Sequence, residues 1–163
     1  MSEDLTLDPM QLAMREIADV MRNDPWFAAD VPIFDNIKGN IVETVKSKLA
    51  AKIGLCVTVE IITDGTVDYG VGSHAINAQA HVTIVEQPLF NRAPGGTGKT
   101  AFMVLLKAIC LFNPNSTPKP CLLTKFRHAE SDDQIVMNLY GPISFSITPN
   151  ASVPEALTLK TEP

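Results

Sequence analysis

The segment INAQAHVTI, residues 76–84, decides the fold of this 163-residue chain. Apolar and polar residues alternate along it without a break. A period of two is typical of a strand with one buried face and one solvated face, as in an antiparallel sheet. Residues 55–61 alternate in the same way. The two segments therefore predict a long hairpin, with a loop of turn-forming residues from Asp64 to Gly72 between its strands.

Helical spacing precedes this hairpin. Asp8 followed by Pro9 marks the start of a helix, in which apolar residues recur at helical intervals. A second amphipathic helix is expected from Asp35 or Asn36 to Ile53. Between the two helices lies an apolar linker, which we expect to be pressed onto the core.

A third helix is predicted from Thr100 to Phe112. Its residues are apolar on almost every side. A helix of this kind is buried on more than one side. It is therefore either a central core helix or a helix that a neighbouring subunit covers.

The C-terminal third predicts two further strands, residues 121–127 and 134–140, with an interruption at Gly141-Pro142. Residues 149–163 contain three prolines and little periodicity, so we expect a C-terminal arm. The order α-α-β-β-α-β-β predicts an α+β fold: a mainly antiparallel sheet of about four strands packed by two to three helices. One domain is expected over residues 1–148.

Composition narrows the range of functions. The formal net charge of −5 argues against sequence-independent binding to nucleic acid, which needs a basic face. No apolar run approaches the roughly 20 residues of a membrane span, and the N-terminus does not resemble a signal peptide. The three cysteines share no metal-binding spacing, so they are predicted to be small core residues.

The segment APGGTGKT, which ends at Thr100, is similar to the Walker A pattern GxxxxGK[ST]. Gly98, Lys99 and Thr100 match, and a helix follows. However, Ala93 replaces the leading glycine, the preceding strand is half polar, and only 63 residues follow. These leave no room for the further βα units of a P-loop fold. We predict a glycine-rich turn, with Thr97 or Gly98 capping the helix, and keep nucleotide binding as the less favoured alternative.

Other patterns of catalytic or metal-binding residues are not found. His74, His81 and His128 lack the spacing of metal ligands, and no nucleophile elbow or zinc-protease motif occurs. We therefore predict no catalytic residues, no cofactor and no metal site.

The region from about Val31 to Thr148 resembles the tail terminator, or tail completion, proteins of tailed bacteriophages and their prophage relatives. The stretch from Glu86 to Lys99 looks like an ENPxxNR…GTGK pattern in phage tail genes, with Gln87 in place of the Asn. The amphipathic helix before it, the apolar helix after it and the closing hairpin add to the likeness.

The resemblance implies a non-enzymatic subunit of a ring, commonly a hexamer, at the head-proximal end of the tail tube. Its expected partners are further copies of itself, the tail-tube protein and a neck or head-completion protein. Another neck or minor tail role is the alternative. The expected location is the virion, after assembly in the bacterial cytoplasm. Arg92, Lys99, Asp64 and Asp68 are candidates for contacts with neighbours, and a solvated surface is the alternative for each.

Overall fold

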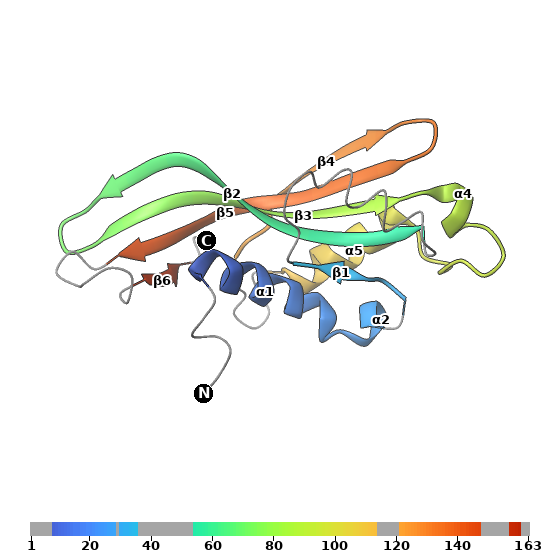
Figure 1. The fold of residues 1–163 in the computed structure, drawn as a ribbon, viewed down its shortest axis with the longest axis horizontal. Helices are drawn as coiled ribbons and strands as arrows, with labels where there is room; N and C mark the ends of the chain where they lie inside the picture. The colour runs from blue at the N-terminus through green and yellow to red at the C-terminus, as the bar shows by residue number, and fades with distance from the viewer. Residues whose placement is uncertain (1–7, 29, 36–53, 114–120, 148–156, 161–163) are drawn as a thin grey trace.

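The computed structural model describes residues 8–28, 30–35, 54–113, 121–147 and 157–160. These form a twisted six-stranded sheet in the order β1-β2-β3-β5-β4, with β6 beside β5. Helices α1 and α5 pack on one face of this sheet, α1 against β2 and α5 against β3 and β5 (Figure 1). The α+β class is therefore as predicted, but the sheet is larger than expected and mixed.

The centre of the sheet is the predicted hairpin, β2 (Leu55–Tyr69) and β3 (His74–Glu86). The two strands are antiparallel, and the register shifts between Thr63 and Val67. A loop over the whole of Asp64–Gly72 was therefore the wrong expectation. The turn-forming residues Asp64 and Gly65 lie in a bulge, where Gly65 has a positive φ, and the strand then continues to Tyr69.

Strand β5 (Ile135–Ile147) pairs with β3 along its full length, and β4 (Lys125–Glu130) forms a second hairpin with its first half. The predicted interruption at Gly141-Pro142 was wrong. The carbonyl of Tyr140 accepts a hydrogen bond from Thr124 N, on the side of β5 that faces away from β3. The backbone nitrogen of Pro142, two residues further along β5, points to the same side. Neither β4 nor β6 pairs with Pro142, so its missing N–H costs no ladder bond.

Two short strands at the edges of the sheet were not predicted. β1 (Ile33–Phe34) pairs with β2 in parallel, and β6 (Leu157–Lys160) pairs with the end of β5. β1 has only two residues, too few for a period to show. β6 falls within the segment predicted as an arm. These strands raise the count from about four to six and make the sheet mixed.

Helix α1 (Pro9–Arg22) begins where the sequence predicts. The Asp8 side chain accepts a hydrogen bond from Gln11 N at 2.9 Å, which caps the first turn. In the following linker, α2 (Pro25–Ala28) is a single helical turn that buries Phe27 completely. This burial confirms that the linker is pressed onto the core.

Helix α5 (Ala101–Leu111) confirms the third predicted helix, but its cap differs from the prediction. The hydroxyl of Thr100 accepts a bond from Met103 N at 3.3 Å, so Thr100 is the N-cap in place of Thr97 or Gly98. The second predicted helix, up to Ile53, begins at the edge of the described residues and lies outside them.

The core lies between the sheet and the two helices. Alternate residues of β2, β3 and β5 point into it, as the period of two requires. The helices contribute Ile17 and Met21 from α1 and Val104 and Leu105 from α5. The buried strand residues on this helix-side face are Leu55, Val57, Val59, Ile61, Ala78, Ala80, Val82, Ile84, Met137, Leu139, Ile143 and Phe145.

Candidate assembly site

The loop between β3 and α5 is built around one buried side chain, Asn91. It ends α4 (Pro88–Asn91), a helical turn that follows directly on β3. Its amide Nδ2 donates to Glu86 Oε2 at 2.6 Å and to the carbonyl of Lys99 at 2.7 Å. Its Oδ1 accepts from the hydroxyl of Thr97 at 2.6 Å. One amide therefore joins the end of β3 to both ends of the loop.

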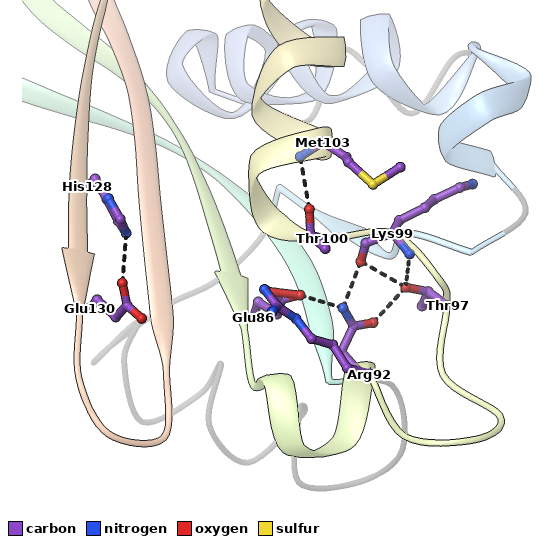
Figure 2. A network of polar contacts seen from close by, with 9 residues as sticks. Glu86, Arg92, Thr97, Lys99, Thr100, Met103, His128 and Glu130 are labelled. Carbon is purple, nitrogen blue, oxygen red and sulfur yellow. Dashed lines mark hydrogen bonds and ion pairs between the residues drawn. The ribbon is translucent and has the colours of Figure 1, made fainter.

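Glu86 is fully buried, although it carries a carboxylate. Arg92 reaches over the end of β3 and forms an ion pair with it at 3.0 Å. Figure 2 shows Glu86 and Arg92 together on one side of the loop, with Thr97 and Lys99 on the other. A buried carboxylate is tolerated only when it is paired and hydrogen-bonded, and both conditions hold here.

Lys99 points away from this network (Figure 2). Its ammonium donates to the carbonyl of Trp26 at 2.5 Å and to Asp30 Oδ2 at 2.9 Å, and it lies over the Trp26 ring at 4.5 Å. Its side chain is only 15% exposed. The lysine of the Walker-like segment therefore fastens the loop to the α2 region of the same chain.

The structure brings Arg92 and Lys99 into one loop, but each has a partner within the chain. The other two candidate contacts lie on the hairpin, far from that loop in the sequence. Asp68 is exposed and accepts a bond from Asn77 at 2.7 Å. Asp64 lies in the bulge of β2, and the structure does not describe its side chain. Sequence reasoning missed Asn91, whose only signal was its place inside the tail-gene pattern.

A second feature is the outer face of α5. Its inner residues pack on the sheet, whereas five apolar or weakly polar residues remain exposed on the other side. Phe102 and Leu106 are 53% and 48% exposed. Lys107 turns away from this face, toward an ion pair with Asp24 at 3.6 Å. The α5 face consists of Phe102, Met103, Leu106, Ile109 and Cys110.

A third feature is the far end of the hairpin, on the same side of the sheet as the helices. Thr63 pairs with Ala78, and Val67 with Ile76, so these residues continue the core-facing row of the sheet. These residues lie past the end of α1, where no helix of the described chain covers the sheet. Val67 and Tyr69 are 45% and 80% exposed. We call this surface the hairpin shelf: Thr63, Val67, Tyr69 and Ile76. The buried Phe145 of β5 lies at its inner end.

An open pocket of about 180 Å³ lies at the inner end of the hairpin shelf. Met10, Ile76 and Phe145 make its walls apolar, and Asp8 stands at the start of α1 beside it. The shelf is therefore a hollowed apolar surface next to a helix terminus.

Ionisable groups outside the loop show two shifts that follow from burial. Burial raises the pKa of the Cys121 thiol to about 12. Partial burial also raises the pKa of Glu60, and the charge of His81 on the neighbouring strand works in the opposite direction.

Among residues 8–28, 30–35, 54–113, 121–147 and 157–160, no three His, Cys, Asp or Glu residues are placed to hold a metal ion. Over the same part of the chain, no helix has both the length and the hydropathy to cross a bilayer.

Two comparisons of the sequence with known proteins were made against families and curated proteins. Neither the scan against protein-family models nor the search of the curated proteins found a match. The likeness to tail terminator proteins therefore stays a prediction from the sequence pattern.

Proposed function

We propose that this chain is a structural assembly protein of a phage tail. In this proposal six copies form a ring that caps the tail tube, ends tube polymerisation and joins the tube to the neck. Its partners are further copies of itself, the tail-tube protein and a neck or head-completion protein, and its place is the virion. Such a role needs surfaces and no chemistry.

The observation that carries the proposal is the exposed α5 face. An 11-residue helix presents Phe102, Leu106 and Ile109 to solvent, with no charged residue among them. Contiguous apolar surface of this kind marks an interaction site in a soluble protein. The centres of protein–protein interfaces are also depleted in charged residues, and the α5 face likewise contains no charged residue.

The loop network supports the same proposal. The residues of the tail-gene pattern, from Glu86 to Lys99, hold the loop and the start of α5 in one position through Asn91. Because Thr100 caps α5 directly after this loop, the network fixes where the α5 face stands on the sheet. The pattern thus has a structural explanation that requires no nucleotide.

The proposal is tested with tail tubes assembled from purified tube protein. Adding the chain to polymerising tubes is expected to stop their growth, and electron microscopy is expected to show a ring at one tube end. Tubes that grow to the same length with and without the chain would contradict the terminator role. Binding to isolated neck complexes in place of tubes would favour the alternative of another neck subunit.

The nucleotide-binding alternative is tested separately. A ligand that binds only the native state raises its melting temperature. Because the Lys99 ammonium is already engaged by Asp30 and the carbonyl of Trp26, we expect no shift at millimolar ATP and Mg²⁺. A rise in melting temperature that Lys99→Ala abolishes would favour the nucleotide site.

A further inference from the structure

Lys107 is the only charged residue of α5. Residues three and four positions apart on a helix lie side by side, so Lys107 stands next to Met103 and Cys110, at the edge of the α5 face. A lysine side chain is long enough to place its ammonium over such neighbours. Whether the α5 face carries a charge therefore depends on where this ammonium is held.

Asp24, in the turn before α2, holds the ammonium of Lys107. Its Oδ2 lies 3.6 Å from Lys107 Nζ, and its side chain is only 18% exposed. Its Oδ1 accepts a hydrogen bond from Trp26 N at 2.8 Å, and its backbone carbonyl accepts one from Phe27 N at 3.1 Å. Because these bonds fix Asp24 at the start of α2, the ion pair draws the lysine to α2 and away from the α5 face.

We propose that Asp24 is a positioning residue for the α5 face, which it keeps free of charge by holding the Lys107 ammonium beside α2. The position of the ammonium follows from the ion pair, whatever covers the face. Its consequence for association rests on the proposed function, in which copies of the chain assemble. An interface at this face desolvates the ammonium together with its carboxylate, which costs less than desolvating an ammonium that has lost its partner.

Lys99, the residue before the N-cap of α5, provides a matched comparison. Its ammonium contacts Asp30, the carbonyl of Trp26 and the Trp26 ring. Removing the charge of Asp30 therefore leaves Lys99 with two contacts. In the part of the chain that the structure describes, Lys107 has Asp24 as its one ion-pair partner. Asp30→Asn thus changes the net charge as Asp24→Asn does but releases no lysine.

Sedimentation velocity of these variants tests the consequence for association. Asp24→Asn keeps an oxygen that caps α2 and loses the charge, and it is expected to weaken self-association at least about tenfold. Asp30→Asn is expected to associate like the unmodified chain. Asp24→Ser, which keeps a capping hydroxyl, gives a second variant, and circular dichroism and the melting temperature check that each variant folds.

Rescue separates the position of the lysine from the ion pair itself. Lys107→Met added to Asp24→Asn is expected to restore association, because no ammonium remains to be desolvated. Lys107→Met alone is expected to associate at least as well as the unmodified chain, since Asp24 stays fixed at α2. If Asp24→Asn associates like Asp30→Asn, or if Lys107→Met alone weakens association as much as Asp24→Asn, the inference is wrong.

The thiol of Cys110 reports the position of the ammonium in the single chain. Cys110 is exposed, whereas Cys56 and Cys121 are buried. Its rate of reaction is measured with dianionic dithiobis-nitrobenzoate and with neutral dithiodipyridine, at low salt and at a concentration where the chain is monomeric. The ratio of the anionic to the neutral rate is expected to rise at least about threefold in Asp24→Asn, because a released ammonium attracts the anion.

The same ratio is expected to stay at the unmodified value in Asp30→Asn and in Asp24→Asn with Lys107→Met. An unchanged ratio in Asp24→Asn would show that Asp24 does not hold the ammonium off the face, and would overturn the inference while leaving the proposed function standing. An unmodified chain that is monomeric and fails to cap tubes would contradict the function, and the ratio would still decide the position of the ammonium.

Discussion

Asn91 is the residue on which the loop before α5 depends most. It is buried, and its amide makes three side-chain hydrogen bonds, one of them to the buried carboxylate of Glu86. Removing one partner of a buried charged group leaves the other uncompensated, which is more costly than the bond itself. The same residue type at an exposed site has no such consequence.

We therefore expect Asn91→Ala to lower the free energy of unfolding by about 3 kcal/mol, measured by urea denaturation. The matched control is Asn77→Ala, which removes an exposed hydrogen bond to Asp68 and is expected to cost less than about 1 kcal/mol. Equal losses from the two substitutions would show that the loop network does not stabilise the fold.

The buried thiol of Cys121 gives a prediction about pH. Its pKa is about 12 in the folded chain against an ordinary value of 9.0, so its protonated form is favoured by folding. That contribution is complete below pH 9 and is lost as the pH rises toward 12, because the unfolded chain ionises first. Unfolding free energy above pH 9 is therefore expected to fall more steeply in the unmodified chain than in Cys121→Ala, by up to about 1.4 kcal/mol per pH unit. Parallel curves would contradict this.

At the scale of elements, the segment between β3 and α5 is held by close approach of backbone to backbone. A Cβ on Gly96 would stand 1.8 Å from the carbonyl oxygen of Asn91, whereas a Cβ on Gly95 would meet nothing within 4 Å. Gly95 has φ of +90°, so a side chain there is strained but not blocked.

Gly96→Ala is accordingly expected to displace the loop and the start of α5, and to lower stability by more than about 3 kcal/mol. Gly95→Ala is expected to lower it by about 1 kcal/mol. Thermal unfolding of the two variants measures the difference. A Gly96→Ala chain as stable as Gly95→Ala would mean that the loop adapts without cost.

How much of the fold the sequence predicts depends on how local each signal is. The hairpin and α1 follow from periodicity and from the cap at Asp8, which short segments carry by themselves. The continuation of β5 through Pro142 does not follow from a local signal. The proline is acceptable there only because neither β4 nor β6 pairs with it. β1 pairs with a strand more than 20 residues further along the sequence, and β1 and β6 have only two and four residues, too few for a local pattern to identify them.

The candidate site divides in the same way. The apolar residues from Phe102 to Cys110 already predict a helix with two covered sides, and one of those sides is exposed in the part of the chain that the structure describes. The contacts of Lys99 were not predictable, because Trp26 and Asp30 lie about 70 residues away in the sequence. The pattern that resembles a phosphate loop is thus a set of residues that hold the loop to the rest of the chain.

At the scale of the whole molecule, the described chain has a well-packed centre and two apolar surfaces without a cover. The core between sheet and helices accounts for the fold, but it leaves the α5 face and the hairpin shelf exposed. Both surfaces lie on the helix side of one sheet, at different places along its length. We infer that the α5 face is covered when copies of the chain assemble, and this is the central claim of the account.

Sedimentation velocity over a range of concentrations tests this claim most directly. The unmodified chain is expected to sediment as one ring-sized species, and so is Leu89→Glu, a control that places the same charge at an exposed site on α4. Leu106→Glu is expected to sediment as a monomer, because a charge in the α5 face cannot be desolvated without a partner. An unmodified chain that is monomeric at every concentration, or a Leu106→Glu chain that sediments like the unmodified one, would contradict the account.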